Sequence, residues 1–346
     1  MRAVVIHAPR DLRVEAVEPV EPAAGEVVVR IGAGGICGSD LHYYQDGGFG
    51  TVRIREPMIL GHEIAGTVSR VGAGVTRVAP GTLVAVNPSR PCGHCRYCLE
   101  GKPNHCLNMR FYGSAMPFPH IQGAFRDELL ITEAQAFALP DGTTVGEAAM
   151  AEPLSVGLHA IQRAGGVLGK RVLVTGCGPI GSLLIGALRR AGAAEIVAAD
   201  IASAPLACAL KMGADRVIDS ARDIAAMDEF KREKGSFDVL FEASGNERAM
   251  LGALETVRPR GVVVVVGLGG DIRMPMNAIV GREIELRGTF RFHEEFAHAV
   301  HFIGSGLVDV TPVLSATVPV ERAVEAFELA ADRTRSMKVQ LSFAAH

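Results

Sequence analysis

The sequence predicts an α/β protein in which a β-rich domain is combined with a doubly wound parallel sheet. The chain has 346 residues, which is enough for two domains of ordinary size. Residues 1–34 alternate short β-branched runs with proline and glycine turns, a pattern typical of an antiparallel sheet or small barrel. From residue 151 onward, apolar strand patterns alternate with helical ones, as in a doubly wound sheet.

Further strand patterns in the first part of the chain lie at residues 27–31, 66–72 and 81–86. A group of metal-binding residue types falls between them: Cys37, Ser39, His42, His62 and Glu63. Thiolate, imidazole and carboxylate are ligands that zinc prefers, and a catalytic site uses three of them. We therefore expect an open metal site on loops of an all-β scaffold. The alternative is a buried structural cysteine with an ordinary surface His-Glu pair.

A second metal pattern follows, with the spacing C-x2-C-x2-C-x7-C at Cys92, Cys95, Cys98 and Cys106. The chain holds seven cysteines, an odd number without a secretory signal, which argues against a disulfide framework. Four thiolates this close in a loop rich in glycine and proline predict a closed, tetrahedral zinc site. An iron–sulfur cluster is the competing interpretation.

The second part of the chain opens with a nucleotide-binding pattern. A buried strand at 171–175 leads into G-x-G-x-x-G, a helix at 182–190 follows, and a strand at 195–199 ends in Asp200. Glycines allow the backbone to approach a pyrophosphate at a helix N-terminus, and an acidic residue at this distance binds ribose hydroxyls. We expect NAD, with NADP less favoured, at these residues: Gly176, Gly178, Pro179, Ile180, Gly181 and Asp200.

The alternation continues to the end of the chain. The expected helices lie at 203–212, 248–257 and 294–304, and the expected strands at 216–218, 237–242, 261–267 and 339–341. We expect residues 285–291 to return the chain toward the first domain.

Charge and hydropathy exclude several functions. A net charge of −3 gives no reason to expect nucleic acid or an anionic membrane as partner. The apolar stretch at residues 3–6 is too short for a signal peptide, and no run approaches the ~18–20 residues of a membrane span. We expect a cytoplasmic enzyme with a small-molecule substrate.

These motifs together resemble the zinc-dependent medium-chain dehydrogenase family over essentially the whole chain. The segments that carry the resemblance are 35–40, 61–63, the four-cysteine lobe, 152–154 and 174–181. Segments 87–95, 109–116 and 287–292 are similar to sugar-acid dehydrogenases of the polyol and sugar-acid branch.

The resemblance implies a GroES-like catalytic domain from residues 1–150 and 291–346, and a Rossmann domain from 151–290. It also implies two zinc ions, one structural in the cysteine lobe and one catalytic at Cys37, His62 and a carboxylate. Many family members have a cysteine where this chain has Glu152. We expect Glu63 as the resting ligand with Glu152 behind a bound water, or an exchange between the two.

In this interpretation the carbon that bears a secondary hydroxyl of a polyol or sugar acid gives hydride to NAD, and the hydroxyl loses its proton. Ser39 would accept the hydroxyl proton and pass it through the nicotinamide ribose to His42, because histidine is the residue type that titrates near neutral pH. An arginine suits a substrate carboxylate, and Arg291 is the first candidate. The weaker substrate candidates are Tyr43, Arg110 and His120. A neutral-polyol or amino-alcohol dehydrogenase is the alternative, and the family suggests a dimer or tetramer.

Overall fold

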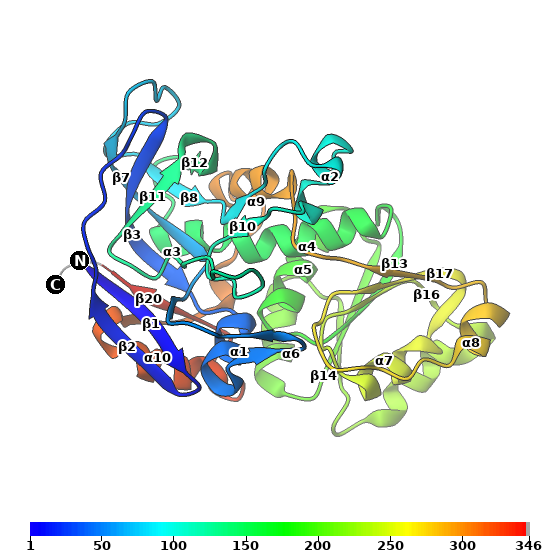
Figure 1. Ribbon diagram of the computed structural model, residues 1–346. Helices are drawn as coiled ribbons and strands as arrows, with labels where there is room; N and C mark the ends of the chain where they lie inside the picture. The colour runs from blue at the N-terminus through cyan, green and yellow to red at the C-terminus, as the bar shows by residue number, and fades with distance from the viewer. Residues whose placement is uncertain (344–346) are drawn as a thin grey trace. The chain divides into compact units, whose positions relative to one another are not determined.

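The computed structural model describes residues 1–343 of the chain and divides them into two compact units (Figure 1). The first comprises Met1–Glu152, Phe296–Gly306 and the chain from Leu314 onward; the second comprises Pro153–Glu295 and Leu307–Val313. Residues 291–295 and 307–313, which the sequence analysis assigned to the catalytic domain, lie in the second unit. Among the described residues no helix is both long and apolar enough to cross a membrane.

The first unit is built on a seven-stranded sheet with the order β12-β8-β7-β3-β20-β19, in which β11 also pairs with β3. Its strands are β3 (Glu26–Gly35), β7 (Glu63–Val71), β8 (Leu83–Val86), β11 (Glu128–Thr132), β12 (Ala136–Ala138), β19 (Leu314–Pro319) and β20 (Lys338–Ser342). The smaller sheets contain β1 (Arg2–Ala8), β2 (Asp11–Ala16), β4 (Gly48–Phe49), β5 (Val52–Arg53), β6 (Met58–Ile59), β9 (Ser89–Arg90) and β10 (Arg110–Phe111). This β-rich unit confirms the expected scaffold.

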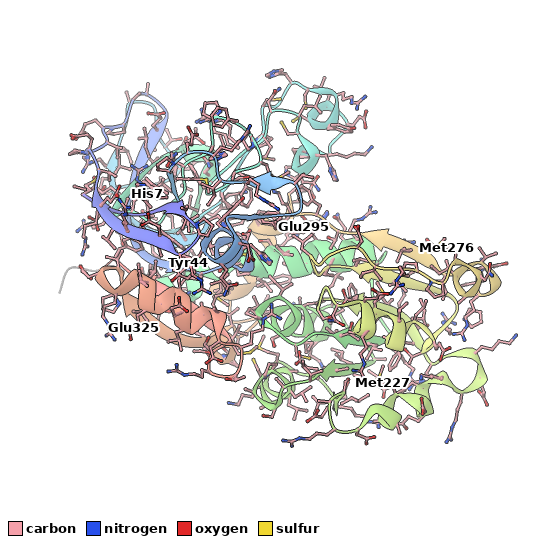
Figure 2. The ribbon with its side chains drawn as sticks, turned by 60° about the horizontal axis from the view of Figure 1, so that its bottom comes forward. His7, Tyr44, Met227, Met276, Glu295 and Glu325 are labelled. Carbon is pink, nitrogen blue, oxygen red and sulfur yellow. The ribbon has the colours of Figure 1, made fainter. Side chains whose placement is uncertain are left out.

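Short helices accompany these strands. They are α1 (Gly38–Asp46), α2 (Arg96–Leu99), α3 (Val145–Ala149), α9 (Glu295–Gly304), α10 (Ala323–Ala331), η1 (Pro103–His105), η2 (Glu133–Gln135) and η5 (Val320–Arg322). Figure 2 shows Tyr44 on α1 near the helix that carries Glu325, α10. The Tyr44 hydroxyl donates a hydrogen bond of 2.6 Å to Glu328 of that helix.

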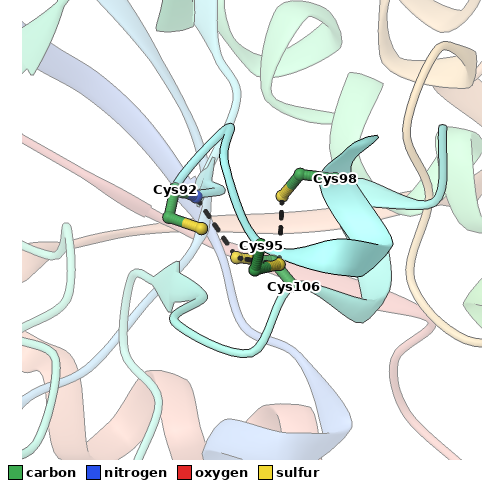
Figure 3. Close-up of side chains that lie close together, drawn as sticks. All are labelled: Cys92, Cys95, Cys98 and Cys106. Carbon is green, nitrogen blue, oxygen red and sulfur yellow. Dashed lines mark hydrogen bonds between the residues drawn. The ribbon is translucent and has the colours of Figure 1, made fainter. Parts of the chain in front are cut away.

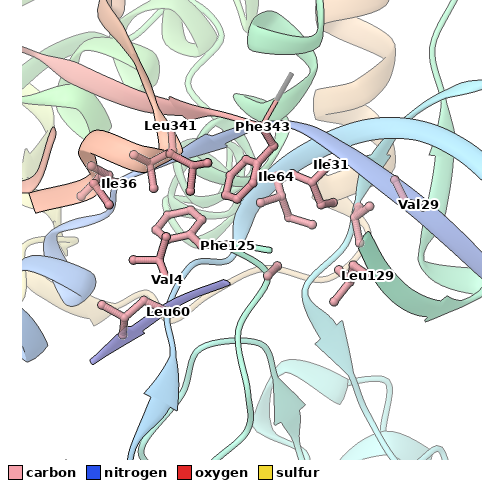
Figure 4. Packing of buried hydrophobic residues seen from close by; sticks show 14 of the residues in the cluster. Val4, Val29, Ile31, Ile36, Leu60, Ile64, Phe125, Leu129, Leu341 and Phe343 are labelled. Carbon is pink, nitrogen blue, oxygen red and sulfur yellow. The ribbon is translucent and has the colours of Figure 1, made fainter. Parts of the chain in front are cut away.

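Apolar side chains from the inner faces of the strands form the core of the first unit (Figure 4). Phe125 is fully buried there, beside Ile64 of β7 and Leu341 of β20. Its ring makes an edge contact with Phe327 of α10, with the centroids 6.4 Å apart. Burial of each such side chain contributes about 1.5–3 kcal/mol, so this core holds β3, β7 and β20 in fixed register.

The second unit is a six-stranded parallel sheet with the order β15-β14-β13-β16-β17-β18. The strands are β13 (Arg171–Thr175), β14 (Glu195–Asp200), β15 (Arg216–Asp219), β16 (Phe237–Glu242), β17 (Val257–Val265) and β18 (Glu285–Gly288). The helical segments are α4 (Ala151–Arg163), α5 (Pro179–Arg190), α6 (Ser203–Lys211), α7 (Glu247–Leu254), α8 (Met276–Gly281), η3 (Ile224–Lys234) and η4 (Thr311–Val313). Helices α5, α6 and α7 contact β13, β14 and β16, respectively (Figure 1). The predicted α/β class is therefore confirmed.

One expectation about local structure was wrong. The first metal-binding stretch does not lie only on loops: helix α1 begins directly after Cys37 and carries Ser39 and His42. A reciprocal cap starts this helix, because Asp40 accepts a hydrogen bond from the backbone N–H of Cys37 at 3.0 Å. Residues 285–288 also add a sixth strand to the parallel sheet, which the sequence analysis did not predict, and the chain enters the first unit at Phe296.

Candidate active site

Three metal-binding side chains meet where strands β3 and β7 pair. Cys37 comes just after β3, His62 directly precedes β7, and Glu63 is the first residue of β7. The antiparallel register places Gly35 opposite Glu63, which joins two stretches distant in sequence. One ligand atom from each side chain lies within 4.8 Å of the others. Position 35 requires glycine, because a Cβ there would lie 2.2 Å from Glu63 Oε2.

This donor set fits a zinc ion. Thiolate, imidazole and carboxylate are the ligand types of catalytic zinc sites. His62 Nδ1 is buried and has no hydrogen-bond partner among the described residues, an arrangement that costs about 1–3 kcal/mol unless a ligand is bound. Burial, followed by the charge of Glu63, raises the pKa of the Cys37 thiol to about 12. A cation is therefore needed beside Cys37 to hold its thiolate.

Lys338 belongs to this site, although the sequence analysis did not single it out. Its Nζ lies 2.8 Å from Oε1 and 2.7 Å from Oε2 of Glu63, and it donates a 3.0 Å hydrogen bond to the carbonyl of Ile36. Burial lowers the pKa of Lys338, but the charge and hydrogen bond of Glu63, together with the charges of Cys37 and Glu152, outweigh burial and the net pKa is raised. The sequence signal is a lysine directly before the apolar strand pattern at 339–341.

Two further carboxylates surround the donor set. Asp40 is fully buried, accepts the backbone N–H of Gly61 at 3.2 Å, and lies 3.9 Å from His62 Nδ1. Burial raises its pKa, although the charge of His62 opposes this. Glu152, near the start of α4, is 6% exposed, and burial raises its pKa to about 8. The charges of His62 and Glu63 both act on Glu152, which lies beside the donor set but outside the group of three.

The four cysteines of the second metal pattern converge on one point (Figure 3). The sulfur of Cys95 lies 3.6 Å from that of Cys98 and 3.9 Å from that of Cys106. Zinc bound tetrahedrally at about 2.3 Å would separate its sulfur ligands by about 3.8 Å, so the spacing fits. The backbone N–H of His94 is the main cause that lowers the pKa of Cys92 to about 5, which favours the thiolate.

The predicted proton-transfer residues share one helix face. Ser39 and His42 lie three residues apart on α1, and residues at this spacing are neighbours on a helix surface. Ser39 is half-buried, whereas His42 is exposed and its Nδ1 lies 3.7 Å from Asp46. Tyr43 points the other way: it is 2% exposed, and its hydroxyl accepts the backbone N–H of Ala115 at 3.0 Å.

The remaining substrate candidates differ in their surroundings. Arg110 is exposed and pairs across strands with Arg90. His120 is buried with both ring nitrogens engaged, one 2.9 Å from the carbonyl of Pro117 and the other accepting the N–H of Arg55 at 2.9 Å. Arg291 has a φ of 54°, and its guanidinium lies 4.9 Å from the ring centre of Phe290. A non-glycine residue at positive φ is uncommon and often marks a functional position.

The glycine-rich segment forms the expected strand-turn-helix. Gly176 has a φ of 84°, and Gly178 precedes α5, whose first residue is Pro179. Ile180 and Gly181 continue that first turn. The helix N-terminus therefore presents free N–H groups at the carboxyl edge of the parallel sheet, as a pyrophosphate requires.

Asp200 is held rigidly beside this turn. Its Oδ2 accepts the N–H of Cys177 at 2.7 Å, and its Oδ1 accepts those of Ile201 and Ala202 at 2.7 and 3.0 Å. These three bonds fix the carboxylate at the end of β14. In dinucleotide-binding folds an acidic residue at the end of the second strand binds the ribose hydroxyls.

Two families of known protein domains match successive parts of the chain. Residues 23–141 match the alcohol dehydrogenase GroES-like domain, and residues 179–305 match the zinc-binding dehydrogenase domain. The chain is 46% identical to L-idonate 5-dehydrogenase (NAD(P)(+)) of Escherichia coli over 317 residues, which covers 91% of each protein. It is 35% identical to sorbitol dehydrogenase of Bacillus subtilis, over 95% of this chain and 93% of that protein.

A solved structure supports the same relationship. The crystal structure of L-idonate 5-dehydrogenase from Escherichia coli superposes with a TM-score of 0.95 and 43% identity. The match covers 99% of this chain and 97% of the other.

Proposed function

The chain belongs to the family of zinc-binding alcohol dehydrogenases with a GroES-like domain, and we propose that it oxidises L-idonate at a secondary hydroxyl with NAD as hydride acceptor, giving 5-ketogluconate. Membership of the family makes it an oxidoreductase that acts on an alcohol with a nicotinamide cofactor. The observation that carries the substrate is the 46% identity to an L-idonate 5-dehydrogenase over nine-tenths of both chains.

We assign a catalytic zinc ion to Cys37, His62 and Glu63, and a structural zinc ion to the four cysteines of the lobe. The catalytic zinc would supply Lewis acidity toward a substrate hydroxyl. Glu152 lies in the electric field of the same residues and would exchange with Glu63 or hold a water beside it. Lys338 neutralises the charge of Glu63 through a buried ion pair of 2.7 Å.

The proton of the hydroxyl needs a route to solvent. Ser39 is half-buried at the start of α1, and the exposed His42 lies one turn further along the same face. Ser39 would accept the proton, and His42 would deliver it to water, because imidazole exchanges protons near neutral pH. Removal of His42 should therefore slow turnover at low pH more than at high pH, where hydroxide replaces it.

NAD preference rests on Asp200. A carboxylate fixed by three backbone N–H groups accepts hydrogen bonds from ribose hydroxyls and repels a 2′-phosphate. The residues that follow, Ile201 and Ala202, offer no cation to a phosphate. A homo-oligomer and a cytoplasmic location remain predictions of the sequence, and light scattering tests the first directly.

For the substrate carboxylate we propose Arg291, whose guanidinium is positioned by a left-handed backbone and the Phe290 ring. Arginine binds carboxylates through two parallel hydrogen bonds. Arg291→Ala should raise KM for L-idonate far more than KM for sorbitol. An equal effect on both would exclude recognition of the carboxylate by this residue.

The substrate itself is tested by NADH formation with L-idonate, sorbitol, xylitol and L-threonine as separate substrates. We expect the highest kcat/KM with L-idonate. Sorbitol dehydrogenases at 35% identity make a neutral polyol the second candidate. If sorbitol or xylitol leads, the enzyme class holds and the sugar acid is wrong.

A further inference from the structure

Glu242, the last residue of β16, buries a carboxylate at the carboxyl edge of the parallel sheet. The side chain is 0% exposed. Its hydrogen-bond donors are two backbone N–H groups and one hydroxyl rather than a cation. A buried carboxylate is costly, and this one is stabilised by how the adjacent loop is folded around it.

The carboxylate fixes the loop that follows β16. Oε1 accepts the N–H of Ser244 at 2.8 Å and that of Gly245 at 3.2 Å, together with the Ser244 hydroxyl. Oε2 accepts the N–H of Gly245 at 3.1 Å. The Ser244 hydroxyl in turn accepts the N–H of Asn246, whose side chain caps helix α7. The Glu242 carboxylate therefore fixes the backbone conformation from residue 244 to the start of α7.

This loop lies directly against its two neighbours. A Cβ at Gly176 would lie 2.5 Å from the backbone nitrogen of Ser244, and one at Gly267 would lie 2.2 Å from that of Gly245. The backbone N–H of Ala243 also donates to the carbonyl of Thr175 at 2.7 Å. The loops after β13, β16 and β17 thus pack backbone against backbone, so a shift of the middle loop displaces the glycine-rich turn.

The position of these loops gives the carboxylate a role. Strand order runs outward from β13 in one direction and from β16 in the other, which makes the pair a topological switch point. Dinucleotides bind outside the carboxyl ends of the strands at such a point. We infer that Glu242 is a positioning residue for the nicotinamide dinucleotide: its buried carboxylate holds the 244–245 backbone and the Gly176 turn in the conformation that receives the cofactor.

This inference rests on the proposed function only in requiring a dinucleotide. Glu242→Gln tests it, because an amide keeps the shape but turns a –NH2 donor toward N–H groups that need an acceptor. The matched control is Asp238→Asn at the opposite end of the same strand. Asp238 also accepts a backbone N–H, that of Arg171 at 2.7 Å, but at the amino edge.

The readout is the dissociation constant of NADH, measured by its fluorescence in the zinc-loaded protein, with zinc content and Tm measured alongside. For Glu242→Gln we expect binding weaker by about tenfold, the equivalent of one lost charge-assisted hydrogen bond. KM for NAD should rise similarly while kcat at saturating NAD changes little. Asp238→Asn should lower Tm but leave NADH binding within about twofold of wild type.

A second variant keeps the inference testable if Glu242→Gln does not fold. Ser244→Ala removes one donor to the carboxylate and should weaken NADH binding by a few-fold, less than Glu242→Gln, because the two backbone N–H donors remain. NADH binding unchanged in the folded Glu242 variant, or weakened equally by Asp238→Asn, would overturn the positioning role and leave the proposed function intact. Wild-type protein that does not bind NADH would overturn both.

Discussion

Replacement of Lys338 by methionine removes the cation that faces Glu63. Methionine keeps an unbranched side chain of similar length, so packing in β20 changes little. The Nζ of Lys338 lies within 2.8 Å of both carboxylate oxygens, and the two side chains are 4% and 0% exposed. The variant therefore leaves a buried carboxylate without its partner charge.

The structure sets the size of the expected effect. Removing one member of a buried ion pair costs about 3–5 kcal/mol, most of it the penalty of the charge left behind. The lost hydrogen bond to the carbonyl of Ile36 adds about 1 kcal/mol. We therefore expect metal-free Lys338→Met to lose about 4–6 kcal/mol of unfolding free energy. Zinc should restore part of this, because the ion places positive charge beside Glu63.

Urea denaturation of metal-free and zinc-loaded protein measures both quantities. The double variant Glu63→Gln/Lys338→Met should be more stable than Lys338→Met alone, because it carries no unpaired charge. A loss below about 1 kcal/mol for Lys338→Met, the range of an exposed ion pair, would refute the reasoning. The reasoning would also be refuted if the double variant lost as much free energy of unfolding as the two single variants lose together.

Three other outcomes follow from the structure. Burial raises the pKa of Glu295, but hydrogen bonds from His159 and from the backbone outweigh burial and lower it to about 2 from 4.5. The stability that this carboxylate contributes is complete above pH 4.5 and is lost as the pH falls toward 2. Glu295→Gln should therefore lower the free energy of unfolding by about 2 kcal/mol at pH 7, after allowance for solvent screening. Near pH 2 the same substitution should change it by almost nothing, and urea titrations at the two pH values measure the difference. Cys98→Ser should release one zinc ion per chain in metal analysis while the catalytic-site zinc stays bound; unchanged zinc content would contradict the four-cysteine site. Asp200→Ala should shift the ratio of kcat/KM for NAD over NADP by about tenfold or more toward NADP, and an unchanged ratio would remove Asp200 from cofactor selection.

Much of the architecture was predictable because its signals are local. Strand patterns of β-branched residues and the turn at Gly176 each depend on a few neighbouring residues, and the parallel sheet appears where the pattern predicts it. The four-cysteine cluster was equally predictable, since the short spacing of Cys92, Cys95, Cys98 and Cys106 keeps their four thiols in one loop.

The features that the sequence analysis missed are Lys338, helix α1 and strand β18, and the first of them depends on contacts between distant segments. Lys338 reaches Glu63, which lies 275 positions away in the chain, because β20 pairs with β3, and no local pattern encodes that pairing. The loop-like composition around Cys37 concealed α1, since that helix starts with a capping hydrogen bond from the backbone N–H of Cys37 to Asp40 and not with apolar periodicity. The sixth strand at β18 was missed because its side chains are largely exposed and carry no buried-strand pattern.

We expect zinc at Cys37, His62 and Glu63 to be required for oxidation of L-idonate. The most direct test is NADH formation from L-idonate while zinc is removed from and returned to protein whose metal content is measured at each step. Activity should disappear with the zinc ion assigned to Cys37, His62 and Glu63 and return in proportion to it, and Cys37→Ser should not recover activity. Full turnover of L-idonate with that zinc absent would contradict the account.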